Sequence, residues 1–271
     1  MKLHYHHFGQ GQPLIILHGL FGLSDNWVTI GKRLAANYHV FIPDQRNHGM
    51  SPHDRTFNYY ALADDLLDFM EEHELENIVL LGHSMGGKVA MNFALDYPEK
   101  VDRLVIVDMG VREYKARAIH YHLIEAMESV DFDTLTSRQE IEEQLKQYIP
   151  QKPLRLFIMK NLKRFSQNQL GWKLNLPVLK ANLDTVVEGV NRNDRFNRPA
   201  LFIGGGKSDY IEPHDVKAIK EIFPKAEVEI IQDASHWVHA DTPEAFCKIV
   251  SSFLHKSCKS MEDLIQENRN S

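Results

Sequence analysis

Short apolar runs alternate with longer amphipathic stretches along most of this chain. The apolar runs are four or five residues long and occupy 14–17, 39–42, 78–81, 103–107, 200–203 and 228–231. The stretches between them place apolar residues at helical spacing, over 25–36, 59–74, 88–96, 213–222 and 243–254. A continuous apolar run is typical of a strand buried on both faces. Its alternation with helices predicts an α/β fold with a mostly parallel central sheet flanked by helices.

The alternation stops between residues 111 and 189. This part contains helix-like segments such as 116–130 and 138–148, and we expect no strand between them. An inserted helical layer is the simplest interpretation. The predicted organisation is an α/β core of residues 1–110 and 190–255, a helical cap of 111–189 and a polar, frayed C-terminal tail of 256–271.

Composition and charge narrow the class of protein. The 271 residues, of which 43% are hydrophobic, fit one large domain or one domain with an insertion. A net charge of −6 makes nucleic acid an unexpected partner. No apolar stretch reaches about 18 residues, and the first residues lack the apolar segment of a secretory signal. Cys247 and Cys258 form neither a disulfide framework nor a CxxC motif, so we expect a cytoplasmic protein without a membrane span.

A nucleophile motif lies between a predicted strand and a predicted helix. Residues 82–86 read Gly-His-Ser-Met-Gly, directly after the strand 78–81. A serine on such a sharp strand-to-helix turn projects its hydroxyl above the sheet, and the flanking glycines let strand and helix approach closely. The motif therefore identifies Ser84 as the candidate nucleophile.

A serine hydroxyl needs a base and an acid that orients the base. His236 follows the last predicted strand, so its loop reaches the same sheet edge as Ser84. Two carboxyl groups can complete the set. Asp108 ends the strand 103–107 and Asp209 follows the strand 200–203, and either gives the chain order Ser, Asp, His of α/β hydrolases.

The turn after the first predicted strand is a candidate oxyanion hole. It reads His-Gly-Leu-Phe-Gly over 18–22, and the backbone N–H of Leu20 or Phe21 can pair with that of Met85 to hold a developing oxyanion. His18 and His48 are interpreted as structural hydrogen-bonding residues.

The other histidines do not indicate a metal. His4, His6, His7, His120 and His122 cluster or alternate, but no carboxylate-rich ligand motif accompanies them. We expect them at the surface or in ordinary packing, and we predict neither a metal nor another cofactor.

Several strings together resemble a known superfamily over about residues 3–254. They are His18-Gly-Leu-Phe-Gly22, Arg46-Asn-His-Gly49, Gly82-His-Ser-Met-Gly-Gly-Lys88, Gly205-Gly-Lys-Ser208 and Ala234-Ser-His-Trp-Val-His-Ala240. The chain resembles the α/β-hydrolase superfamily, and within it the YbfF-type esterases and the eukaryotic abhydrolase domain-containing group. That resemblance implies an esterase or thioesterase whose helical cap covers the serine. It favours Asp108 as the acid, whereas the wider superfamily more often uses the position of Asp209.

These features predict a serine hydrolase that cleaves esters or thioesters of small to medium acyl chains through an acyl-enzyme. Phe21, Tyr121, Phe157 and Trp172 are candidate substrate contacts, and Phe132, Met159 and Phe165 are further apolar candidates in the cap. The alternatives are a carbon–carbon bond hydrolase, an amidase, a cofactor-free oxygenase or a non-catalytic ligand-binding protein. The expected partner is a small molecule, and the oligomeric state is left open.

Overall fold

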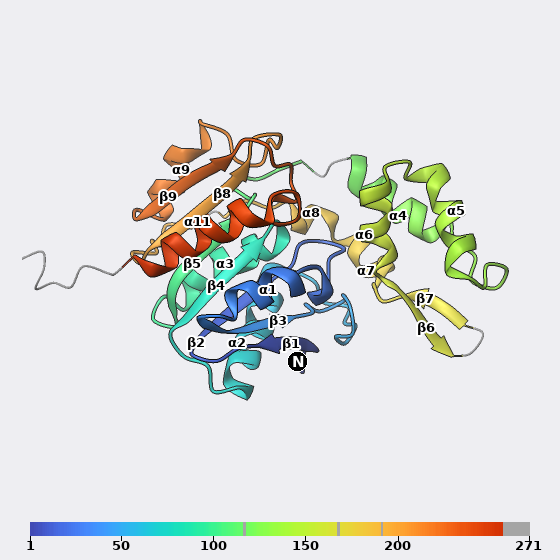
Figure 1. The fold of residues 1–271 in the computed structure, drawn as a ribbon, viewed down its shortest axis with the longest axis horizontal. Coiled ribbons are helices and arrows are strands. Elements are labelled where there is room, and N and C mark those ends of the chain that lie inside the picture. Colours follow the sequence, from blue (N-terminus) through green and yellow to red (C-terminus); the bar gives the residue numbers. More distant parts are fainter. Residues whose placement is uncertain (116–117, 167–168, 191, 257–271) are drawn as a thin grey trace, which may run out of the picture.

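The computed structural model describes residues 1–115, 118–166, 169–190 and 192–256. Its centre is a seven-stranded sheet in the order β1-β3-β2-β4-β5-β8-β9 (Figure 1). All neighbouring pairs are parallel except β1 with β3. The strands are β1 (Tyr5–Phe8), β2 (Gln12–Leu17), β3 (Tyr38–Pro43), β4 (Ile78–His83), β5 (Val101–Val107), β8 (Ala200–Gly205) and β9 (Ala226–Ile231).

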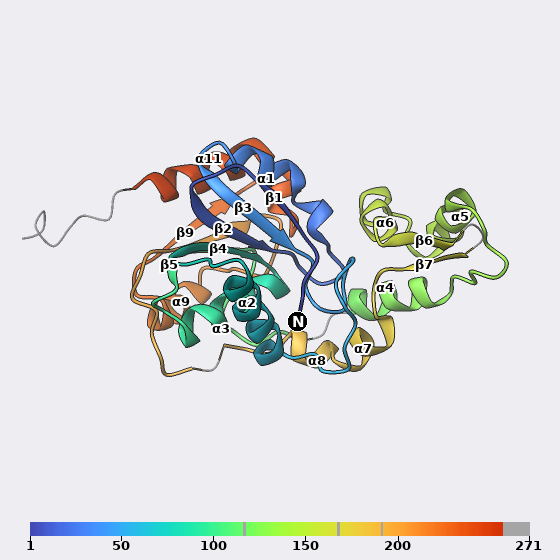
Figure 2. The same ribbon diagram turned by 90° about the horizontal axis from the view of Figure 1, so that it is seen from below.

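Helices cover both faces of this sheet (Figures 1 and 2). They are η1 (Ser24–Asn26), α1 (Val28–Leu34), α2 (Tyr59–Glu72), α3 (Met85–Asp96), α9 (Asp215–Ile222), α10 (Val238–Asp241) and α11 (Pro243–His255). Successive residues of β2 belong to different apolar cores, Leu14 and Ile16 to the core under α1 and α11, and Ile15 to the core under α2 and α3. Because both faces are buried, the strands are continuous apolar runs rather than alternating ones. The predicted mostly parallel sheet flanked by helices is confirmed.

The sequence pattern missed the edge strand β1. Its sequence, Tyr-His-His-Phe, is only partly buried, so it contains no continuous apolar run. The predicted helix 25–36 is divided into a short 3-10 turn, η1, and the helix α1.

We call residues 111–189, which the sequence predicts to be an insertion, the inserted segment. It contains α4 (Ala118–Glu128), α5 (Arg138–Tyr148), α6 (Lys152–Met159), β6 (Leu162–Ser166), β7 (Gln169–Trp172), α7 (Leu176–Ala181) and α8 (Leu183–Val186). Figures 1 and 2 both show α4, α5, α6 and the β6–β7 pair standing to one side of the sheet. The expectation of no strand in this segment was wrong, because β6 and β7 form an antiparallel hairpin. These two strands are short and only partly buried, so no apolar run marks them.

Two further expectations concern a membrane span and the C-terminal tail. None of the helices in the described ranges has the length and apolarity needed to cross a bilayer. The predicted tail lies, from residue 257 onward, outside the described residues, and so does Cys258.

Candidate active site

Ser84 lies on the sharp turn between β4 and α3. Its backbone has φ 53° and ψ −118°, a strained conformation for a residue with a side chain. The turn closes only because its neighbours are glycines. A Cβ on Gly82 would lie 2.2 Å from the Gly86 carbonyl oxygen, and a Cβ on Gly86 would lie 2.4 Å from the Leu17 carbonyl oxygen. The local sequence therefore forces the serine hydroxyl out of the sheet plane at the start of α3.

One histidine connects this serine to a buried carboxyl group. His236 Nε2 lies 3.1 Å from Ser84 Oγ, and His236 Nδ1 lies 2.7 Å from Asp108 Oδ2. A carboxylate can only accept, so Nδ1 carries the proton and donates it to Asp108. Nε2 then has a free lone pair and accepts from the Ser84 hydroxyl. A histidine in this tautomer can remove the hydroxyl proton as the oxygen attacks a carbonyl.

The two candidate acids lie in different environments. Asp108 is fully buried, with φ 48° at the end of β5, and its carboxylate also accepts from the Gly205 N–H at 2.9 Å and from the Ser208 hydroxyl. Asp209 is exposed, and its backbone carbonyl accepts from Arg112. The carboxylate in contact with His236 is that of Asp108.

Two residues that the sequence analysis did not single out hold His236 in place. The Tyr210 ring stacks on the imidazole, with ring centres 4.4 Å apart and planes 26° apart. His83 Nε2 donates to the His236 backbone carbonyl at 2.9 Å. Burial and the nearby His236 hold the pKa of His83 well below its usual value, so His83 is neutral. In the sequence, only the position of His83 between Gly82 and Ser84 points to its contact with the His236 loop.

The turn after β2 lies against the serine. A Cβ on Gly19 would come within 3.0 Å of His83 Nδ1 and 3.2 Å of Ser84 Cβ, so this turn packs closely against the serine. The Phe21 N–H already donates to His48 Nε2 at 3.3 Å. Of the two backbone N–H groups predicted from this turn, that of Leu20 is therefore the candidate donor to the oxyanion. Met85 is the first residue of α3, and its N–H precedes the hydrogen-bond ladder of that helix.

His18 and His48 make structural hydrogen bonds, as predicted. His48 Nδ1 donates to the Arg46 carbonyl at 2.9 Å, and His18 Nε2 accepts from the Gln45 N–H at 3.0 Å. Burial lowers the pKa of His48 to about 3 and also lowers the pKa of His18. Both rings are therefore neutral, and His48 Nε2 stays available as an acceptor near neutral pH.

A cavity of about 530 Å³ opens onto Ser84. The inserted segment supplies an apolar wall consisting of Ile119, Leu123, Pro153, Leu154, Leu156 and Phe157. The core supplies a more polar wall that includes Asn26, His83, His236, His239 and Asp241. Such a cavity can hold an apolar chain on one side and a polar group near the serine.

Only some of the predicted substrate contacts line this cavity. Phe21 and Phe157 do, whereas Tyr121 and Trp172 are not among its lining residues. Ile119 and Leu123 lie on one side of α4, and Tyr121, two positions after Ile119, lies about 200° around the helix from it. Trp172 Nε1 donates to the Met127 carbonyl at 2.9 Å.

The five histidines that we expected at the surface or in ordinary packing mostly lie there. His4, His6 and His7 contact Asp44, Asp25 and His39, and His122 contacts the Tyr148 carbonyl. His120 differs, because it lines the cavity.

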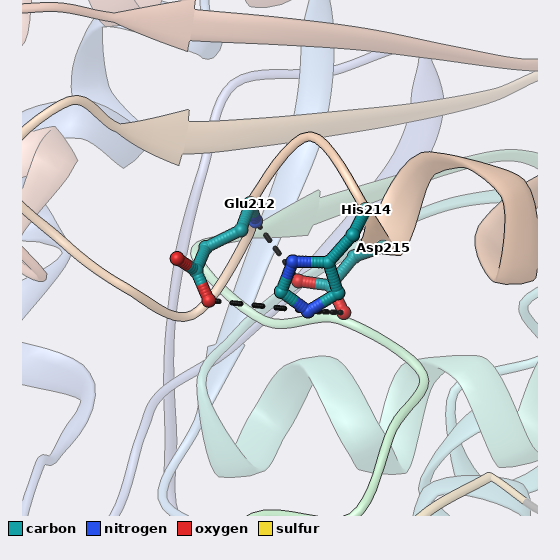
Figure 3. Close-up of side chains that lie close together, drawn as sticks. All are labelled: Glu212, His214 and Asp215. Atoms are coloured by element: carbon teal, nitrogen blue, oxygen red, sulfur yellow. Dashed lines mark hydrogen bonds and ion pairs between the residues drawn. The ribbon is translucent and has the colours of Figure 1, made fainter.

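One group of side chains in the described ranges has the spacing of metal ligands, namely Glu212, His214 and Asp215 (Figure 3). Arg112 already lies against its carboxylates, at 2.9 Å from Asp215 and 3.5 Å from Glu212. The guanidinium supplies the positive charge that these carboxylates need. The group is therefore explained by an ion-pair cluster with Arg112, a residue of the inserted segment.

Comparisons with known proteins agree with this architecture. Residues 12–243 match the family model described as alpha/beta hydrolase fold. The chain is similar to the sn-1-specific diacylglycerol lipase ABHD11 of Danio rerio, with 37% identity over 91% of this chain and 79% of the relative. It is 31% identical to Esterase YbfF of Escherichia coli (strain K12), over 90% of this chain and 93% of the relative. A solved structure titled Marine microorganism esterase shares 39% identity, with a TM-score of 0.90 over 93% of this chain and 99% of that one.

Proposed function

This chain belongs to the α/β-hydrolase fold family and is a carboxylic ester hydrolase, and we propose that it acts as a serine hydrolase through Ser84, His236 and Asp108. The proposal is supported most directly by the two contacts of His236, at 3.1 Å to Ser84 and 2.7 Å to Asp108. A nucleophile, a base and an orienting carboxylate in series are what acyl transfer by a serine requires.

The reaction proceeds in two steps. His236 Nε2 takes the Ser84 proton while Oγ attacks the ester carbonyl carbon, and the N–H groups of Leu20 and Met85 stabilise the oxyanion. His236 then protonates the leaving alcohol, which gives an acyl-enzyme on Ser84. Water, deprotonated by the same histidine, attacks this ester, and His236 returns the proton to Ser84 Oγ as the acid is released. Asp108 stabilises the imidazolium in both steps.

The cavity sets the expected substrate class. Its apolar wall accommodates an acyl chain, and its volume of about 530 Å³ lies within the usual range for small-molecule sites. We propose carboxylic esters of small to medium acyl chains as substrates, with Phe21 and Phe157 among the chain contacts. The inserted segment then acts as a cap that shapes the acyl pocket. Thioesters of the same acids use the same chemistry and form a second arm of the test.

The test is hydrolysis of a p-nitrophenyl ester series from acetate to palmitate, beside one acyl thioester and labelling by a fluorophosphonate probe. We expect activity that is lost in Ser84→Ala, together with labelling of wild type but not of the variant. Wild-type protein without labelling and without activity above that of Ser84→Ala would refute the serine mechanism. Labelling without ester hydrolysis would point to another acyl acceptor or another bond, such as an amide.

A further inference from the structure

Hydrogen bonds fix the peptide groups of the turn from Gly19 to Gly22. The Gly19 carbonyl accepts from the Gly22 N–H at 2.9 Å. The Phe21 N–H donates to His48 Nε2. The N–H and C=O of one trans peptide point in opposite directions. The bond to the Gly19 carbonyl therefore turns the N–H of Leu20 outward, away from the turn.

Besides His18 Nδ1, which donates to the Gly19 carbonyl at 2.9 Å, a further contact of this turn comes from the inserted segment. Asn161, between α6 and β6, donates its Nδ2 to the Phe21 carbonyl at 2.8 Å. Asn161 is fully buried, and both of its backbone groups are bonded, the N–H to the Ile158 carbonyl at 2.9 Å and the C=O to the Lys173 N–H at 2.8 Å. The backbone of Asn161 is thus fixed on both sides of its side chain. Phe21 is bonded by the core through His48 and by the inserted segment through Asn161.

Phe21 needs this support because its backbone is strained. It has φ 60°, a region that a bulky residue adopts only when its surroundings hold it there. Asn161 itself is not optimal for stability, since its Oδ1 is buried without a hydrogen-bond partner in the described part of the chain. The bond from Nδ2 to Phe21 is therefore the interaction that accounts for an asparagine at this position.

We propose that Asn161 is a positioning residue for the reaction, through which the inserted segment fixes the oxyanion turn. By holding the Phe21 carbonyl it keeps the Leu20 N–H directed at the carbonyl oxygen of the substrate. The inserted segment then does more than cover the cavity, because transition-state stabilisation depends on its contact with the core. This inference rests on the proposed serine mechanism.

The experiment compares Asn161→Ala with a matched control, Asn175→Ala. Asn175 also joins the inserted segment to the core, because its Nδ2 donates to Asn47 Oδ1 at 2.9 Å, but it does not touch the oxyanion turn. Asn47 Oδ1 keeps a second donor, the Asp54 N–H, when Asn175 is truncated. The measurements are kcat and KM for the best p-nitrophenyl ester, the inhibition constant of a trifluoromethyl ketone with the same chain, and the melting temperature.

We expect Asn161→Ala to lower kcat by about 10- to 100-fold with KM nearly unchanged, because misplacing one amide by about 1 Å costs up to this factor. The trifluoromethyl ketone forms a tetrahedral adduct with an oxyanion, so its affinity should fall by a similar factor. Asn175→Ala should keep kcat within about threefold. Asn161→Asp, which keeps the size but lacks the donor, should lose kcat in the same way.

Three results would overturn the inference while leaving the serine mechanism intact. These are an unchanged kcat in Asn161→Ala, a loss carried by KM alone, or an equal kcat loss in Asn175→Ala. Failure of both Asn161 variants to fold would assign the residue a purely structural role and would also overturn it. Failure of the proposed function is separate, because wild-type protein would then show no activity that depends on Ser84.

Discussion

Replacing Asp108 by asparagine tests the order of groups in the site. The buried carboxylate accepts from His236 Nδ1 at 2.7 Å, from the Gly205 N–H at 2.9 Å and from the Ser208 hydroxyl. An asparagine of the same shape has one acceptor oxygen and one NH₂ group. If the oxygen stays on the Gly205 N–H, the NH₂ faces His236 Nδ1, which must then accept.

That reversal changes the tautomer of the imidazole. His236 would carry its proton on Nε2, where it faces the Ser84 oxygen and cannot take the hydroxyl proton. The same change in a serine protease costs about 10⁴ in kcat, which corresponds to about 5.5 kcal/mol of transition-state free energy. Asp108→Asn should therefore lose about 10⁴ in kcat. Asp209→Asn should stay within about twofold, because this side chain is exposed and the carboxylate that accepts from His236 Nδ1 is that of Asp108.

The assay is steady-state hydrolysis of the best p-nitrophenyl ester at several pH values, with Ser84→Ala as the background. Melting temperatures of both aspartate variants separate a loss of chemistry from a loss of fold. A drop of less than about tenfold in Asp108→Asn, with the fold intact, would refute the tautomer argument. A drop of more than about a hundredfold in Asp209→Asn would show that a different carboxylate orients the base.

Three further predictions address the turn, a buried lysine and the cavity. Gly82→Ala should destabilise the protein by about 1–3 kcal/mol or more and reduce activity, because its Cβ would meet the Gly86 carbonyl oxygen at 2.2 Å; an unchanged melting temperature would contradict this. Burial, with Arg112 nearby, lowers the pKa of Lys88 to about 7, whereas an unfolded lysine titrates near 10.4. Between these two pH values the unfolded chain binds more protons than the folded protein. The free energy of unfolding therefore rises with pH in this range. Urea titrations at several pH values measure the free energy of unfolding of wild type and of Lys88→Met. The variant should lack this rise of up to about 1.4 kcal/mol per pH unit, and an equal pH dependence in both proteins would refute the prediction. Leu123→Trp should shift the preferred acyl chain to shorter esters in the p-nitrophenyl series, because Leu123 lines the apolar wall, and an unchanged preference would place the acyl chain elsewhere.

The sequence by itself determined the order of buried strands and helices in this protein and the tight turn that carries Ser84. Apolar runs mark every strand that is buried on both faces, because burial there leaves no polar position. The glycines around Ser84 are readable without the fold, since the strained turn permits nothing larger. The half-exposed strands β1, β6 and β7 lack such a signal, so the sequence pattern missed them.

Only the tertiary structure decided which side chains meet. Asp108 and Asp209 both follow strands that are neighbours in the sheet, so sequence order leaves both as candidates for contact with His236. The register of β5 and β8, with the Asp108 N–H bonded to the Ile203 carbonyl, turns Asp108 inward, while the chain beyond β8 carries Asp209 to the surface. Asn161 and Phe21 lie 140 residues apart, and neither has a local pattern that announces their contact. Periodicity reports whether a residue is buried, but a hydrogen bond between distant segments depends on how those segments pack in three dimensions.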